Sequence, residues 1–366
     1  MIRTPTTWHA RDNRVAPHER THPVAPLDER YRAPRWLPGG NAQTLWSAVL
    51  ARRHIGPRPH WRRERWTTPD GDFIDVDWTT HPVKEGAPLL VLFHGLEGSS
   101  SSQYAVAFAD WAARQGVMMA VPHFRGCSGE LNLAPRAYHS GDHQEIDWIL
   151  RRFAVLQPER PRMAAGVSLG GNALMRWAGE HGAAIQGVVG AIASVCSPLD
   201  LAAGGHAIGR GFNRLVYTRV FLNTMVPKAL RKLQQHPGLF DGEALRRARD
   251  LYEFDNLFTA PLHGFRNTDD YWRRASAKPC LSAIRVPALA LNALNDPFVP
   301  AASLPCAREV GPCVTLWQPA HGGHVGFPAS LPRWRLPGHV WTMPEAVGAW
   351  LLSHAVSKET AQPQEM

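Results

Sequence analysis

One serine in this chain stands in a pattern that could make it a nucleophile. The pentapeptide GVSLG (166–170) follows a short apolar run and leads into a predicted helix over 169–179. A serine at a sharp strand-to-helix turn projects its hydroxyl out of the sheet, and such a turn favours glycine two residues to either side. We therefore predict a nucleophile elbow with Ser168 as the nucleophile and with Gly166 and Gly170 permitting the turn.

Two residues further along carry the side chains that a serine nucleophile needs. Asp296 and His324 each follow a predicted strand, and His324 stands in the glycine-rich sequence HGGHVGF. An imidazole takes the proton of the serine hydroxyl, and a carboxylate orients the imidazole and stabilises its charge. The chain order Ser168, Asp296, His324 is that of an α/β hydrolase. We predict that these three residues form a catalytic triad.

Other side chains of suitable type fit their possible roles less well. His321 could replace His324 as the base, but the glycine pair before His324 favours His324, and His321 is expected to support the loop. Cys127 has no histidine and aspartate of its own in sequence order, so we interpret it as structural. Neither His139 and His143 nor His321 and His324 have metalloenzyme spacing. We expect no metal and no cofactor.

A hydrolase of this kind also needs N–H donors for the oxyanion that forms during acyl transfer. The sequence HGLEGSS follows the predicted strand 88–93, and Gly95 lets the backbone turn toward the serine. We predict that the N–H groups of Leu96 and Leu169 form the oxyanion hole. The alternative is a structural His-Gly turn. A carboxylate beside an oxyanion is unfavourable, so we expect the Glu97 side chain to point away.

The elements that must position these residues alternate between strand and helix. A hairpin is predicted around the turn PDGD (69–72), and continuous apolar runs, typical of strands buried on both faces of a parallel sheet, follow it. The pattern predicts an α/β-hydrolase fold with a mostly parallel central sheet flanked by helices. The runs are 88–93, 117–121, 163–167, 186–193, 286–292 and 314–317, and the predicted helices are 103–115, 141–153, 169–179, 301–310 and 344–354.

One interval breaks this alternation. Between about 201 and 284 the sequence has amphipathic helical stretches and no convincing buried strand. We expect a helical cap over the ends of the strands, where open α/β sheets bind ligands. The chain then divides into a basic N-terminal arm (1–30), an α/β domain that includes the cap (31–354) and a C-terminal tail (355–366).

Charge and cysteine content limit the remaining function classes. Residues 1–65 carry thirteen arginines, no lysine and five acidic residues, which is +8 of the overall +9. We favour a solubilising arm, and weak association with an anionic membrane surface is the alternative. The arm lacks interleaved aromatic residues, so no nucleic-acid partner is expected. Five cysteines without CxxC spacing, and no membrane-length apolar stretch, predict a cytoplasmic protein.

Eight segments together resemble one branch of the α/β-hydrolase superfamily, the AB hydrolase 4 family of YheT-like hydrolases and their ABHD-type eukaryotic relatives. The resemblance implies the same triad and the hydrolysis of carboxylic esters, such as short-chain esters, acylglycerols or related lipids. The arginine-rich start lies outside the family pattern. The segments are 36–44, 94–100, 124–130, 138–142, 166–172, 254–265, 292–297 and 322–327.

The function predicted from these observations is serine ester hydrolysis through an acyl-enzyme. An acyltransferase, in which an alcohol replaces the hydrolytic water, would use the same residues and is an open alternative. A non-catalytic ligand-binding homologue is a second alternative, although an intact triad argues against it. The predicted partner is a small ester or lipid substrate.

Overall fold

The computed structural model describes residues 26–28, 30–330 and 338–355. The predicted N-terminal arm therefore lies mostly outside the described residues, as do residues 356–366 of the predicted C-terminal tail.

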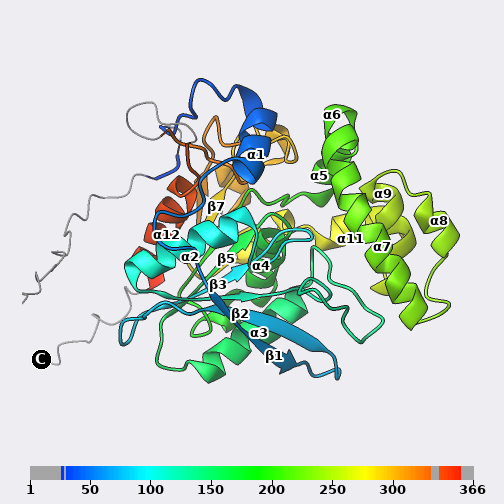
Figure 1. The fold of residues 1–366 in the computed structure, drawn as a ribbon, viewed down its shortest axis with the longest axis horizontal. Helices are drawn as coiled ribbons and strands as arrows, with labels where there is room; N and C mark the ends of the chain where they lie inside the picture. Colours follow the sequence, from blue (N-terminus) through cyan, green and yellow to red (C-terminus); the bar gives the residue numbers. More distant parts are fainter. Residues whose placement is uncertain (1–25, 29, 331–337, 356–366) are drawn as a thin grey trace, which may run out of the picture.

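A single eight-stranded sheet forms the centre of the molecule (Figure 1). Its strand order is β1-β2-β4-β3-β5-β6-β7-β8, and the pairs from β4 to β8 are parallel. The hairpin β1–β2 joins β4 in antiparallel orientation at one edge. The prediction of a mostly parallel sheet is confirmed. The strands are β1 (Trp61–Thr67), β2 (Phe73–Thr79), β3 (Leu89–Phe93), β4 (Met118–Pro122), β5 (Arg162–Val167), β6 (Ala191–Val195), β7 (Ala288–Leu291) and β8 (Val314–Trp317).

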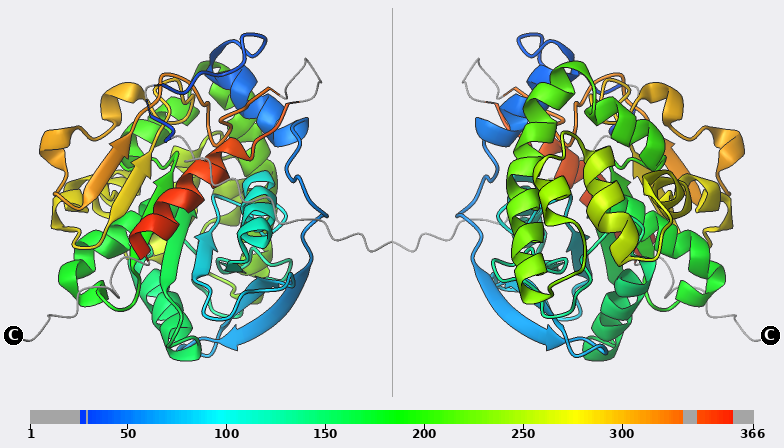
Figure 2. Two further views of the ribbon diagram at one scale, coloured as in Figure 1. Left: turned by 90° about the vertical axis from the view of Figure 1, so that its left-hand side faces the viewer. Right: turned by 90° about the vertical axis from the view of Figure 1, so that its right-hand side faces the viewer.

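Helices cover both faces of the sheet, which explains why its strands are apolar on both sides. On one face, Leu89, Val91 and Phe93 of β3 pack in the core that includes α3 (His143–Leu156) and α4 (Leu169–His181). On the other face, Leu90 and Leu92 pack in the core of α2 (Gln103–Gln115) and α12 (Thr342–Ala355) (Figure 2). Alternate residues of one strand thus belong to different cores.

The chain between β6 and β7 contains only helices and turns. They gather beside the sheet and lie in front of it in the right-hand view of Figure 2. A continuous helical segment, 211–235, includes one π-helical turn and is the longest of them. The elements are α5 (Leu201–Ile208), α6 (Gly211–Asn213), η2 (Arg214–Thr218), α7 (Arg219–Gln235), α8 (Gly242–Arg246), α9 (Leu251–Phe254), η3 (Asp255–Thr259), α10 (Ala260–Leu262), α11 (Thr268–Ala275) and η4 (Lys278–Ala283).

Two sequence predictions of secondary structure are wrong. The interval 301–310 forms two short 3-10 turns, Ala301–Ser303 and Ala307–Glu309, instead of a helix. Pro305 lies between them, and proline both lacks an N–H and disfavours the helical conformation of the residue before it. The predicted strand 186–193 begins only at Ala191, because Gly187 has a φ of 87° that an extended strand cannot contain.

Candidate active site

Ser168 lies at the turn between β5 and α4, with φ 53° and ψ −119°. This conformation is strained for a residue with a side chain, and such strain is concentrated at functional sites. A Cβ at Gly166 would lie 2.5 Å from the carbonyl oxygen of Gly170, and a Cβ at Gly170 would lie 2.5 Å from that of His94. Both contacts are with backbone atoms and too close to relieve cheaply. The turn therefore needs glycine at both positions.

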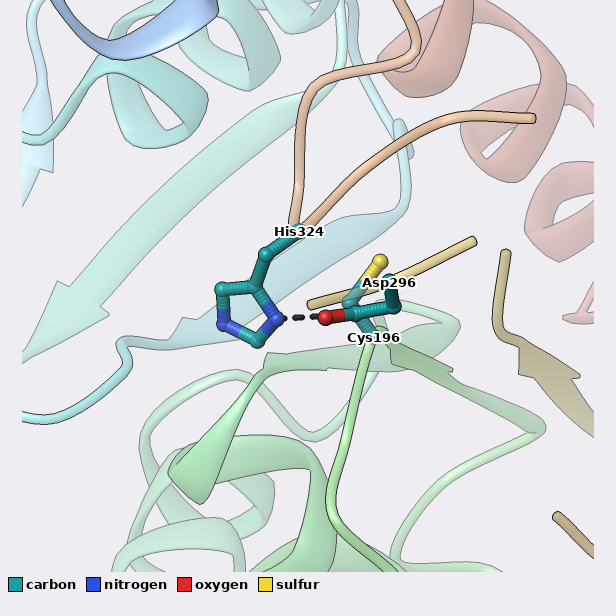
Figure 3. Close-up of side chains that lie close together, drawn as sticks. All are labelled: Cys196, Asp296 and His324. Carbon is teal, nitrogen blue, oxygen red and sulfur yellow. Dashed lines mark hydrogen bonds and ion pairs between the residues drawn. The ribbon is translucent and has the colours of Figure 1, made fainter. Parts of the chain in front are cut away.

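The three residues predicted as the triad meet in one hydrogen-bonded chain. His324 Nε2 lies 3.1 Å from Ser168 Oγ. On the other side of the ring, His324 Nδ1 lies 2.9 Å from Asp296 Oδ2 (Figure 3). The other oxygen, Asp296 Oδ1, accepts the N–H of Phe298 at 2.8 Å. Because the Asp296 carboxylate accepts a hydrogen bond from the Nδ1–H group of His324, the Nε2 atom is left free to accept the serine proton. This geometry suits general-base activation of a serine.

Helix α1 (Gly39–Val49) holds the loop that carries His324, a role that the sequence did not reveal. Gln43 Oε1 accepts the N–H of Gly322 at 2.9 Å, and Thr44 Oγ1 accepts the N–H of His324 at 2.8 Å. The glycine-rich loop is therefore fixed by hydrogen bonds. His321 makes none of these hydrogen bonds and lines a separate groove with Gln43 and residues 32–35 and 37–39.

A buried cysteine supports the same loop from below (Figure 3). Cys196 Sγ accepts the N–H of Val325 at 3.2 Å and donates to the carbonyl of Gly323 at 3.6 Å, so it contacts both neighbours of His324. Burial, and then the charge of Asp296, raise the pKa of the thiol. The potential ligand atoms of Cys196, Asp296 and His324 lie within 4.8 Å of one another. A protonated thiol is a poor metal ligand, so we interpret Cys196 as a support for the loop.

Two tyrosine hydroxyls hold the backbone at the predicted oxyanion hole. Tyr104 Oη accepts the N–H of Gly95 at 2.8 Å, and Tyr138 Oη accepts the N–H of Glu97 at 3.0 Å. Leu96 lies between these fixed residues. Leu169 begins α4, where a helix leaves its first N–H groups without internal partners. In the described part of the chain, neither Leu96 nor Leu169 uses its N–H in a hydrogen bond.

The ring of His94 fixes the same loop from within the core. His94 Nδ1 lies 2.8 Å from the carbonyl oxygen of Gly95, and Nε2 accepts the N–H of Phe124 at 3.0 Å. Burial, followed by the nearby His123, lowers the pKa of His94 to about 3. The ring is therefore neutral at physiological pH, with its proton on Nδ1.

The sequence analysis expected the Glu97 side chain to point away from the site, but Glu97 lines the cavity. Its carboxylate accepts hydrogen bonds from Tyr138 Oη at 2.8 Å and from Lys228 Nζ of α7 at 2.6 Å, and the residue lines the cavity at Ser168. The ammonium group of Lys228 neutralises the carboxylate, which removes the expected conflict with an oxyanion. Cys127 lies 3.6 Å from the same ammonium group, and burial raises the pKa of its thiol to about 12, which does not suit a nucleophile.

A cavity of about 150 Å³ opens onto Ser168. The wall opposite the sheet comes from the segment between β6 and β7, which contributes Phe221 and Met225 from α7. Phe212 and Leu215 of the same helical segment do not line this cavity and are 50% and 67% exposed. The lining is mainly apolar, with single polar groups near the serine, as in small-molecule sites generally.

His139 and His143, from which the sequence analysis expected no metal site, pack against different partners. His139 packs against His263, with ring centroids 4.5 Å apart, whereas His143 faces His181 at 6.0 Å. Burial lowers the pKa of His139 to about 3, so it is a neutral part of the cavity wall.

Fold and site together define the class of this protein. A family model described as the alpha/beta hydrolase fold matches residues 88–329. The chain therefore belongs to the α/β-hydrolase fold family, and within it to the YheT-like AB hydrolase 4 branch. Among the described residues, no helix has the length and apolar character needed to cross a membrane.

Known relatives agree with this assignment. The chain is 40% identical over 281 residues to YheT of Escherichia coli (strain K12), a candidate esterase, with 76% of this chain and 81% of YheT covered. It is 29% identical over 312 residues to phospholipase ABHD3 of Homo sapiens, covering 82% and 74% of the two chains. The solved structure of DcsB, in complex with its substrate analogue, has a TM-score of 0.52 at 14% identity. The match covers 81% of this chain and 99% of that chain. That likeness concerns the fold alone.

Proposed function

We propose that this protein is a serine hydrolase that cleaves carboxylic esters through Ser168, His324 and Asp296. The observation that carries the proposal is the hydrogen-bonded chain from Ser168 Oγ through His324 to Asp296, at a strained elbow that opens into a cavity. The family supports ester chemistry, since its members include a candidate esterase and a phospholipase.

The proposed reaction has two steps, each with a proton transfer. Ser168 Oγ attacks the ester carbonyl while His324 Nε2 takes its proton, and Asp296 stabilises the imidazolium. The N–H groups of Leu96 and Leu169 bind the oxyanion. His324 returns the proton to the departing alcohol, which leaves an acyl group on Ser168. Water, activated by the same imidazole, then releases the acid and restores the serine.

The cavity supports a proposal for the substrate class. Its mainly apolar wall suits an acyl chain, and its modest volume suits a short-chain ester or one chain of an acylglycerol-type lipid. We further propose that the helical segment over about 201–284 acts as a cap and that Phe221 and Met225 limit the chain length accepted.

Labelling with a fluorophosphonate probe at neutral pH tests this function. The wild type should take up one label per chain, mapped to the peptide of Ser168, whereas Ser168→Ala should take up none. Ser303→Ala, which removes another buried serine hydroxyl away from the cavity, is the matched control and should label normally. Absence of label on folded wild type would contradict the proposal and favour a ligand-binding homologue.

Product analysis separates hydrolysis from acyl transfer. With a p-nitrophenyl ester and an added alcohol, the proposal predicts free acid as the main product. A new ester as the main product would identify an acyltransferase.

A further inference from the structure

The helical segment 211–235 has two sides of different character. Its inner side carries buried Tyr217 and Thr218, and Phe221 and Met225 of the same side line the cavity. Its outer side exposes three large apolar residues: Leu215 and Val220 are 67% and 60% exposed, and Phe212, whose ring edge contacts Tyr217, is 50% exposed. Large apolar groups gathered on an exposed helix mark an interaction site.

The charged side chains that the segment itself carries have one sign. Residues 201–240 contain no aspartate and no glutamate. Arg210, Arg214 and Arg219 are exposed, and none of them forms an ion pair with a described residue. Arg214 is near Glu253 and helps to lower the pKa of that carboxyl group. Glu253, however, forms its ion pair with Arg249, at 2.7 Å. The outer side is therefore both apolar and cationic.

We propose that this docking face, formed by Phe212, Leu215 and Val220 with Arg210, Arg214 and Arg219, binds the surface of an anionic lipid bilayer. Helices with exposed apolar residues among arginines lie in the interface, with apolar groups in the acyl boundary and cations at anionic headgroups. The segment that docks is also a wall of the cavity, and a helix with its side chains is only about 10–12 Å across. Docking thus brings the cavity within one helix diameter of the lipid.

Sedimentation with lipid vesicles tests the docking face. The full chain carrying Ser168→Ala is mixed with vesicles of phosphatidylcholine alone or with about one-third phosphatidylserine, so that no lipid is hydrolysed. We expect binding to the anionic vesicles that weakens as salt is added. In the same chain, Phe212→Ser with Leu215→Ser and Val220→Ser should lower the partition coefficient at least about tenfold. Arg210→Gln with Arg214→Gln and Arg219→Gln should remove the preference for phosphatidylserine.

A matched control uses apolar residues exposed elsewhere. Val155 and Leu156 of α3 are 79% and 43% exposed, and α3 lies far from α6 in Figure 1. Val155→Ser with Leu156→Ser should bind vesicles like the parent chain. If the variants of the docking face bound vesicles as well as the parent chain does, the proposal would be overturned, and the basic arm would be left as the binding element. No binding by the folded parent chain would also overturn it.

The result is independent of the proposed chemistry. Vesicle binding is measured on chains that carry Ser168→Ala, so the binding result holds even if the proposal of ester hydrolysis is wrong. Conversely, Phe212→Ser, Leu215→Ser and Val220→Ser are combined in a chain that keeps Ser168. This variant should hydrolyse a water-soluble ester like the wild type, since the three residues do not line the cavity. Circular dichroism confirms that each variant is folded.

Discussion

Tyr138 contacts the predicted oxyanion loop twice. Its hydroxyl accepts the N–H of Glu97 and donates to Glu97 Oε1, and it thereby holds Glu97 at a φ of 55°, which a side chain disfavours. The conformation of this residue sets the direction of the neighbouring Leu96 N–H. Tyr138 is therefore a positioning residue for the proposed reaction.

Tyr138→Phe should lower kcat about tenfold and change KM little, because the oxyanion exists only after attack has begun. The measurement is steady-state hydrolysis of a water-soluble ester. Tyr271→Phe is the matched control, since Tyr271 also lines the cavity but accepts the N–H of Ser140, away from the oxyanion loop. An unchanged kcat for Tyr138→Phe, or an equal loss in both variants, would argue against the positioning role.

The sequence predicted the residues of the site that a local pattern encodes, and missed those that only folding brings together. Ser168, Asp296 and His324 each stand beside glycines or a turn at a strand end, so short-range patterns identify them. Tyr138 and Lys228 reach Glu97 from positions far along the chain. No spacing rule connects such residues, and their chemistry is common on any protein surface.

At the scale of elements, α4 packs against β3 more closely than side chains allow. A Cβ at Gly170 would meet the carbonyl oxygens of His94 and Phe93 at 2.5 and 2.7 Å. These atoms belong to the end of β3, so the helix would have to move away from the sheet and take Ser168 with it. The elbow therefore couples local stability to activity.

Gly170→Ala should lower the free energy of unfolding by about 1–3 kcal/mol, as overpacking does, and should abolish fluorophosphonate labelling. Urea unfolding measures the first effect. The control is Gly209→Ala. Gly209 has a φ of −78°, and the shortest contact of its Cβ would be 3.3 Å, so the loss should be smaller. Equal stability of wild type and Gly170→Ala would show that the packing is looser than described.

Strands were predicted better than the elements around them, for a physical reason. A strand buried on both faces must be apolar throughout. The strands β3, β7 and β8 each lie within a predicted apolar run, and β4 and β5 each extend one residue beyond theirs. The interval 301–310 satisfied a helical pattern of apolar residues, but the backbone restriction at Pro305 outweighed it. The contacts that orient the helices of 201–284 depend on the whole fold.

At the scale of the molecule, buried titratable groups make the fold sensitive to acid. Burial lowers the pKa of His94 and His139 to about 3 from 6.5, so the folded state binds fewer protons than the unfolded state in that range. Burial raises the pKa of Asp70, but its hydrogen bond and attraction to Arg125 outweigh burial and lower it to about 2. The stabilising effect of each group is present at neutral pH and is lost as the pH falls.

Glu145 and Asp255, whose pKa values burial raises to about 7 and about 6, oppose this loss, whereas His339, at about 4, adds to that of His94 and His139. The urea midpoint should therefore decrease as the pH is lowered from about 7 to about 4, because the lowered pKa values of the three histidines outweigh the raised ones. The histidines act first, below 6.5, and Asp70 adds to the loss below 3.8. His139→Gln should weaken the dependence in the upper part of this range. His54→Gln, at a partly exposed histidine outside the cavity, is the control and should leave the dependence unchanged. A midpoint that stays constant or rises toward pH 4 would contradict this account.

Predictions about the arm stay predictions. Residues 1–25 lie outside the described part of the chain, and the cytoplasmic location and the absence of a nucleic-acid partner were inferred from composition. The vesicle experiment separates a contribution of the arm from that of the docking face.

The parallel sheet also determines when during synthesis this protein can become active. Ser168 follows β5, Asp296 follows β7, and His324 follows β8, which lies at the edge of the sheet and is the last of the described strands to be translated. A ribosome-bound chain that has exposed its serine still lacks both the base and the carboxylate. With the proposed triad, the nascent polypeptide therefore gains reactivity toward esters only after β8 has left the ribosome and joined the sheet.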